Sequence, residues 1–327
     1  MQAIRRILVA VKDPRSRSLP AVQKAAQLAR ACKAELELFH AIAGPIYVDT
    51  IWPENGAQQQ VWRSWREEAL KRLEAIAVRL REKGVRVSCS VEWDSPVHEA
   101  IVRRALHIKA DLIVAQCHEG RRLAPWLLRL TDWELLRVSP IPVLLIRNAR
   151  PYRNPVVLAA VDPSHTFAKP SGLDGQILKA AAMVRQALRG TLHAVHAYMP
   201  IPPNVVPTDA LSTALVNELQ EKAEKDAQQL FDKTLKDSGI PRNRRHLVAR
   251  HPIDAIQDVA RETRASIVVM GAVSRSGLKR FYIGNTAERI LGLLPCDVLV
   301  VKPARFPARI PRARRGPRVV GPIPLAY

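Results

Sequence analysis

The apolar stretch Ile7-Leu-Val-Ala-Val-Lys-Asp13 returns later in the chain as Val156-Val-Leu-Ala-Ala-Val-Asp162, and in both copies a proline follows the aspartate. Three further segments repeat in the same order, each 155 or 156 residues apart. These pairs are 36–41 with 192–197, 110–116 with 265–271, and 140–146 with 295–301. Collinear matches at a nearly constant spacing indicate an internal duplication. The sequence therefore predicts two copies of one fold that meet near residues 148–154.

Each copy alternates short apolar runs with helical segments. Short continuous apolar runs are typical of a parallel sheet that is covered on both faces. The expected strands are 5–11, 34–40, 85–92, 111–116 and 142–147, then 155–161, 191–197, 245–250, 266–271 and 297–302. The predicted fold class is α/β, with two tandem doubly wound five-stranded parallel sheets. In such sheets ligands bind beyond the carboxyl ends of the strands, where the strand order reverses.

Composition agrees with two folded domains. The 327 residues are 47% hydrophobic and 25% charged, an ordinary globular composition that excludes bulk disorder. We expect one domain over residues 1–150, a second over 151–303 and a basic tail rich in proline and arginine over 304–327. The sequence has no apolar run of about 18 residues and no signal-peptide pattern at its start, so we expect no membrane span and a cytoplasmic protein. Its four cysteines form no C-x-x-C motif, so we expect neither a disulfide framework nor a metal site.

The net charge of +21 is unevenly distributed. Residues 302–327 hold seven basic side chains and no acidic one, a third of the excess. This segment mixes proline, glycine and arginine with little periodicity, so we expect residues 304–327 to form a poorly ordered end. A basic tail can also bind nucleic acid by releasing counterions, and a nucleic-acid partner stays open as an alternative.

A glycine-rich basic loop follows the fourth strand of the second copy. It begins Gly271-Ala-Val-Ser-Arg-Ser-Gly277 and continues to Gly284-Asn-Thr286. Glycine lets a backbone approach a ligand closely, and a helix that begins at Asn285 or Thr286 would present free amides, which suit phosphate. The loop is therefore a candidate site for a small anionic ligand. The alternative is a turn whose glycines only permit chain reversal.

Together, the repeat, the aspartate after the first strand and this loop resemble the universal stress protein family, in its tandem two-domain E type. Nucleotide-binding members carry Gly-x-x-Gly, nine residues, and then Gly-Ser or Gly-Thr. Here Ser274 stands at the second glycine and Asn285 follows Gly284. The resemblance covers about residues 1–303. It implies a sandwich of the nucleotide-binding alpha-hydrolase-like kind, a stress-response role and, in some members, bound ATP.

Carried onto this chain, the resemblance implies one adenine-nucleotide site, for ATP, in the second domain. Val161 and Asp162 would contact the adenosine side. The residues that would surround the phosphates are Gly271, Ser274, Arg275, Gly277, Gly284, Asn285 and Thr286. The Cβ of Ser274 is expected to weaken the site, since the pattern has glycine there. No general base or Walker lysine stands at its usual spacing, so we expect binding without significant turnover and no catalytic residue. A weak ATPase stays an alternative.

The first copy has lost this loop. At the same offset Gln116 stands opposite Gly271, Glu119 opposite Ser274 and an arginine opposite Gly284. We therefore expect no nucleotide in the first domain. Asp13 remains, and we expect it to anchor a turn after the first strand.

All six tryptophans are in the first copy, where Trp62 and Trp65 share a face of a predicted helix. They could line a pocket for an apolar ligand, which would make the chain a stress scaffold without nucleotide, or they could serve packing within a homodimer or between the two domains. His40 and His196 end equivalent strands, and we expect both to be structural.

Overall fold

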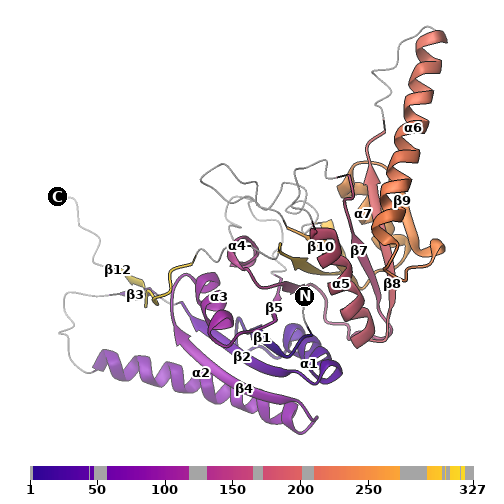
Figure 1. Ribbon diagram of the computed structural model, residues 1–327. Helices are drawn as coiled ribbons and strands as arrows, with labels where there is room; N and C mark the ends of the chain where they lie inside the picture. Colours follow the sequence, from indigo (N-terminus) through magenta and orange to yellow (C-terminus); the bar gives the residue numbers. More distant parts are fainter. Residues whose placement is uncertain are drawn as a thin grey trace, which may run out of the picture. The chain divides into compact units, whose positions relative to one another are not determined.

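The computed structural model describes residues 3–43, 45–47, 57–117, 131–164, 172–200, 210–272, 293–303, 306, 310–316 and 318–320. The chain divides into two compact units (Figure 1). One unit comprises Gln2–Pro151 and Pro307–Tyr327, and we call it the first domain. The other comprises Tyr152–Phe306 with Met1, and we call it the second domain. The chain therefore returns to its first unit after completing its second.

The first domain is a parallel sheet of strand order β4-β2-β1-β5-β6. Its core is built from apolar runs such as Ile7, Leu8 and Val9, which are fully buried. Helix α1 begins at Pro20 and buries Ala25 and Leu28. The elements are β1 (Arg6–Ala10), α1 (Pro20–Cys32), β2 (Glu35–Ile42), β3 (Pro45–Tyr47), α2 (Ala57–Arg81), β4 (Arg86–Trp93), α3 (Val97–His107), β5 (Leu112–Gln116), α4 (Thr131–Val138) and β6 (Val143–Ile146).

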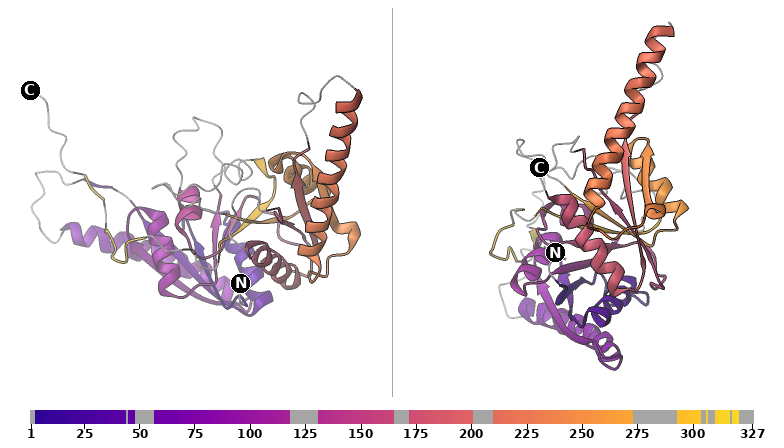
Figure 2. Two further views of the ribbon diagram at one scale, coloured as in Figure 1. Left: turned by 45° about the horizontal axis from the view of Figure 1, so that its top comes forward. Right: turned by 45° about the vertical axis from the view of Figure 1, so that its right-hand side comes forward.

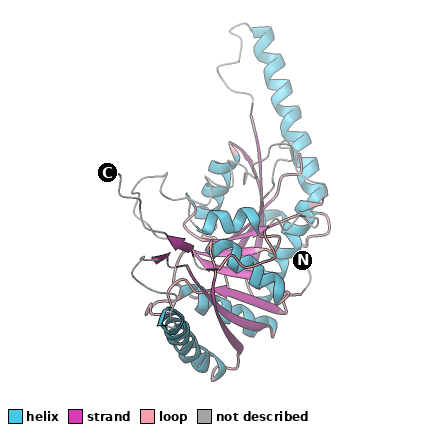
Figure 3. Ribbon diagram, turned by 90° about the vertical axis from the view of Figure 1, so that its left-hand side faces the viewer, coloured by secondary structure: helices cyan, strands magenta, loops and turns pink. Residues whose placement is uncertain are grey.

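The second domain repeats this plan with the parallel order β11-β10-β7-β8-β9. Its long helix α6 buries Phe231 and Leu235, whereas its first half extends beyond the sheet and exposes Leu215 (Figure 2). The elements are β7 (Val156–Ala160), α5 (Leu173–Ala187), β8 (Thr191–Tyr198), α6 (Ala210–Leu235), the 3-10 turn η2 (Arg242–Arg244), β9 (Arg245–Ala249), α7 (Pro252–Glu262), β10 (Ile267–Gly271) and β11 (Asp297–Val301). Helices flank the strands of each sheet (Figure 3), and the predicted α/β class with parallel sheets is confirmed.

The duplication extends to individual hydrogen bonds. Gln116 is in register with Ile146, and Gly271 is in register with Val301. One residue later, the Cys117 amide donates to the Ile146 carbonyl at 2.8 Å, and the Ala272 amide donates to the Val301 carbonyl at 3.0 Å. The offset of 155 found in the sequence is therefore a structural equivalence.

The final segment differs from the sequence expectation. We expected residues 304–327 to be a poorly ordered end, but the described residues of 310–320 contact the first domain. Strand β12 (Arg318–Val320) pairs in parallel with β3 (Figure 1). Its partners lie more than 200 residues upstream, so local composition gave no sign of this contact. Among the described residues no helix is long and apolar enough to cross a membrane.

Candidate functional site

The strand order of the second domain reverses between β7 and β10. These two strands are hydrogen-bonded neighbours, with Ala160 in register with Met270. Val161 and Asp162, directly after β7, therefore lie beside Gly271 at one end of the sheet. A reversal of strand order at the carboxyl ends is the usual place for a ligand in a doubly wound sheet.

Three of the nine predicted site residues are thus brought together, namely Val161, Asp162 and Gly271. The other six lie outside the described residues. They are Ser274, Arg275, Gly277, Gly284, Asn285 and Thr286.

Local hydrogen bonds fix the segment after β7. The amide of Val161 donates to the Val195 carbonyl at 3.0 Å, which continues the sheet by one residue. The amide of Asp162 donates to Asp174 Oδ1 at 3.0 Å, and the Ser164 hydroxyl donates to Asp162 Oδ1 at 2.8 Å. Asp174 is buried in the first turn of α5, so it ties the start of this helix to the end of β7. The backbone at Asp162 is therefore held in place by its own domain.

Gly271 has a packing reason to be glycine. A Cβ at this position would lie 2.7 Å from Cδ2 of Leu173 and 3.2 Å from Cδ1 of Ile177, both on α5. At 2.7 Å something must shift, and the atom that must give way is the far end of the flexible Leu173 side chain. The Leu173 side chain thus occupies the space that a Cβ at position 271 would take, whereas the approach of a ligand to this glycine stays a prediction.

The start of α5 adds a partial positive charge at this end of the sheet. Gly172 is its N-cap in the left-handed region, with φ of 88°, and no side chain caps the helix. The first amides of a helix carry the positive end of its dipole and attract anions. Because Asp174 contacts the Asp162 amide, this helix end lies close to the end of β7.

Lys302 is a cation that the sequence reasoning missed. It follows β11, whose last residue is in register with Gly271, so it lies at the same end of the sheet as the candidate site. Its side chain is buried, and its ammonium lies 4.5 Å from the centre of the Phe306 ring. Burial lowers the pKa of Lys302 to about 7. A lysine after a strand is normally solvated, so the sequence gave no sign of this burial.

In the first domain the equivalent strand ends have local structural roles. Asp13 Oδ1 accepts a hydrogen bond from the Arg15 amide at 2.8 Å, which confirms the predicted turn anchor. His40 Nδ1 lies 2.8 Å from the Val11 carbonyl, and burial lowers the pKa of His40. His196 is buried against Phe231, with ring centroids 5.8 Å apart. Both histidines pack inside their own domains, in agreement with the structural role expected for them.

Three tryptophans of the first domain cluster with one another. The ring of Trp93 on β4 lies 6.2 Å from Trp62 and 5.9 Å from Trp65, both on α2. This cluster joins a helix to the edge strand of its own sheet. The described residues also line a cavity of about 270 Å³, but its lining is mostly polar and includes no tryptophan. Trp62, Trp65 and Trp93 therefore pack against one another within their own domain, and an apolar ligand or a dimer contact for the tryptophans stays a prediction.

Comparisons with known proteins agree with this architecture. The profile of the universal stress protein family matches residues 3–147 and again residues 156–302. The chain belongs to the universal stress protein family, with two domains in tandem. The resemblance noted in the sequence is thereby confirmed.

Several relatives are proteins of similar length. Universal stress protein E of Escherichia coli K12 is 29% identical over 226 residues, which cover 68% of this chain and 70% of that protein. Universal stress protein E of Salmonella typhi is 27% identical over 312 residues, which cover 91% of this chain and 95% of that protein. A putative universal stress protein from Pseudomonas aeruginosa UCBPP-PA14 has a crystal structure with a TM-score of 0.70 at 26% identity, covering 93% of this chain and 95% of that one. The similarity to E-type proteins therefore extends over both domains.

Proposed function

We propose that this chain is a cytoplasmic stress-response protein that binds one adenine nucleotide, ATP, in its second domain without significant turnover. Family membership supports the stress-response role. The observation that carries the nucleotide proposal is the reversal of strand order between β7 and β10, which brings Asp162 beside Gly271. The glycine-rich basic loop begins at that same glycine.

Each part of the site has a separate task in this proposal. Asp162, held by Ser164 and by the Asp174 carboxylate, faces the adenosine. The loop amides and Arg275 bind the phosphates, with the amides at the start of α5 adding to the positive potential. Lys302 lies at the same strand ends, and a bound anion would favour its charged form. The domain would then take up a proton when it binds nucleotide.

A nucleic-acid partner has no part in this proposal. The tail arginines Arg314 and Arg315 make ion pairs with carboxylates of the first domain. Part of the basic charge of the tail is thus already paired within the chain.

ATP titration, preceded by native mass spectrometry of freshly purified protein, tests the proposal. We expect one equivalent of nucleotide, and we expect Gly284→Arg to weaken binding by about tenfold or more because its side chain would fill the loop. Arg129→Gly is the matched control, because Arg129 occupies the equivalent position in the first domain. It should leave the stoichiometry at one.

Two results would contradict the proposal. One is the absence of both co-purified nucleotide and saturable ATP binding at millimolar concentrations. The other is equal binding by the wild type and Gly284→Arg. ATP hydrolysis by the wild type that is lost in Gly284→Arg would instead support the weak ATPase.

A further inference from the structure

The first domain carries a cluster of buried carboxylates at the end of β4. Glu92 is the next-to-last residue of this strand, Asp94 comes directly after the strand, and Glu99 lies in the first turn of α3. The side chains are 7%, 0% and 12% exposed, respectively. Burying a carboxylate is costly unless cations and hydrogen bonds compensate it.

Helix α3 supplies part of this compensation. Arg103 pairs with Asp94 and lies 3.5 Å from Glu99. Arg104 is 2.6 Å from Glu37 on β2 and 3.4 Å from Glu92. Two arginines thus meet four carboxylates among the described residues of this cluster. Without further cations the cluster keeps a charge of −2.

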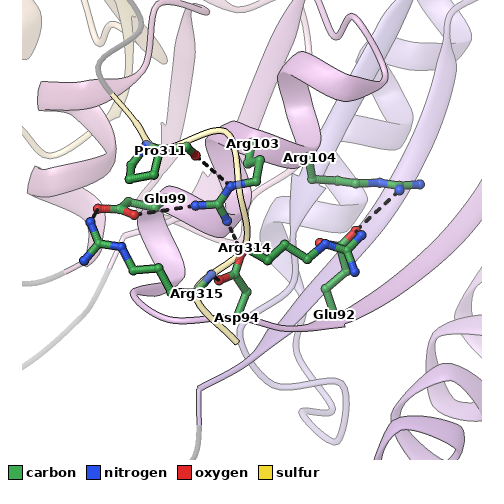
Figure 4. Close-up of polar contacts among 8 residues, drawn as sticks. All are labelled: Glu92, Asp94, Glu99, Arg103, Arg104, Pro311, Arg314 and Arg315. Carbon is green, nitrogen blue, oxygen red and sulfur yellow. Dashed lines mark hydrogen bonds and ion pairs between the residues drawn. The ribbon is translucent and has the colours of Figure 1, made fainter. Parts of the chain in front are cut away.

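The tail brings two further arginines to these carboxylates (Figure 4). Arg314 Nη2 lies 3.0 Å from Glu92 Oε1, and Arg315 Nη2 lies 3.0 Å from Glu99 Oε1. The backbone amide of Arg315 also donates to Asp94 Oδ1 at 3.1 Å. The four arginines then balance the four carboxylates. The tail thus neutralises the net charge of the cluster and adds hydrogen bonds to it.

The backbone of the tail is recognised at two more places. Arg103 Nε donates to the Pro311 carbonyl at 3.0 Å, so the arginine that holds Asp94 also holds the tail (Figure 4). After the two arginines, β12 pairs in parallel with β3 of the first domain. Addition of a strand together with fixed side-chain contacts is a common way to bind an extended peptide.

We propose that Glu92, Asp94 and Glu99, with β3, form a recognition site for an extended arginine-bearing peptide, and that the chain's own segment from Pro311 to Val320 is its ligand. The first domain, which lacks the glycine loop, then has a binding function of its own at the edge strand of its sheet. The bound tail acts as a strap, because the chain that leaves the second domain after Phe306 is held on the first domain by these non-covalent contacts. This inference does not depend on nucleotide binding.

The test uses a full-length chain whose strap has been released. Arg314→Glu with Arg315→Glu reverses both charges and should vacate the site. A fluorescent peptide of residues 307–327 should then bind to this variant saturably, with affinity that falls as salt rises. The wild type and Arg312→Glu should not bind it, because their own tails occupy the site; the described Arg312 is exposed and makes no ion pair with the cluster. A peptide that carries both glutamates should not bind to any of the three proteins.

Hydrogen exchange supplies an independent readout on the same proteins. Release of the strap should speed exchange of the Arg318–Val320 amides by about tenfold or more, since hydrogen bonds to charged groups contribute that much to closure. Arg312→Glu should leave their exchange unchanged.

Three results would overturn the proposal. They are equal exchange in both variants, no peptide binding by a folded Arg314→Glu, Arg315→Glu chain, and equal peptide binding by that variant and the wild type. A concentration-dependent wild-type dimer that is lost in the double variant would overturn the intramolecular assignment.

Discussion

The strand ends of the two domains have the same backbone hydrogen bonds but different side chains and different following loops. Gln116 in the first domain and Gly271 in the second occupy the same register position, and the next amide makes the same hydrogen bond in each. Only Gly271 leads into a glycine-rich loop. A duplicated fold therefore need not duplicate a loop, because the sheet does not require the residues that follow its strands.

A second difference lies one strand further along. Arg147 follows β6 in the first domain, and Lys302 follows β11 in the second. Arg147 is half-buried, whereas Lys302 is buried and its pKa is lowered to about 7. The second domain thus keeps a costly cation at its strand ends.

The largest expected effect concerns Lys302. Its native pKa is about 7, whereas an unfolded lysine titrates near 10.4. Between these values the unfolded state binds more protons, so the free energy of unfolding should rise with pH over this window and should not change through Lys302 below it. At about 1.4 kcal/mol per pKa unit the gain amounts to a few kcal/mol.

Urea unfolding of the wild type, Lys302→Met and Arg147→Met between pH 7 and 10 checks this expectation. Lys302→Met should be more stable than the wild type at pH 7 and should lose the slope. Arg147→Met should keep the slope, because arginine does not titrate in this range. An unchanged slope in Lys302→Met would show that Lys302 stays charged in the native state.

The next largest effect is expected when the residues at the equivalent strand ends are exchanged between the two domains. Gly271→Gln places a Cβ 2.7 Å from Leu173, so we expect a loss of about 1–3 kcal/mol from overpacking. The reciprocal Gln116→Gly removes an exposed side chain from a strand end and should cost about 0.5–1 kcal/mol. Urea unfolding of both full-length variants measures the two values. Equal losses would mean that α5 does not require glycine at position 271.

The smallest expected effect concerns polar side chains at equivalent strand positions of the two domains. Glu37 in the first domain and His193 in the second stand opposite equivalent residues of β1 and β7. Glu37 pairs with Arg104, whereas His193 Nδ1 lies 3.0 Å from His246 Nε2. Burial lowers the pKa of both histidines, and the proximity of His246 lowers that of His193 further.

Because the unfolded state takes up these protons first, stability from this pair should be present above about pH 6.5 and decrease as the pH falls below it. The loss should stay below about 1 kcal/mol, since both rings are partly exposed to solvent. His193→Gln with His246→Gln should reduce the fall of the urea midpoint between pH 7 and 5 without removing it, because burial also lowers the pKa of His40. His107→Gln, at an exposed histidine of the first domain, is the control. A slope in the double variant equal to that of the wild type would assign the acid sensitivity to other groups.

Most strands could be predicted because each is a run of buried apolar residues. The expected strand 111–116 is β5 (Leu112–Gln116), and the expected strand 85–92 is β4 (Arg86–Trp93). The short strands β3 and β12 were missed. Three residues are too few to show a period, and their pairing joins segments more than 200 residues apart. For the candidate site, the positions of Val161, Asp162 and Gly271 followed from the strand ends, whereas Lys302 was not found.

The sequence by itself determined the duplication, the α/β class and the loss of the glycine loop from one copy, because these depend on local residue types and their spacing. Only the tertiary structure showed which side chain lies beside Gly271, that Lys302 is buried, and which carboxylates Arg314 and Arg315 contact. These properties arise from atoms that other elements bring within a few ångströms. The tail shows this most directly, since its arginines look solvated in the sequence and meet buried carboxylates in the fold.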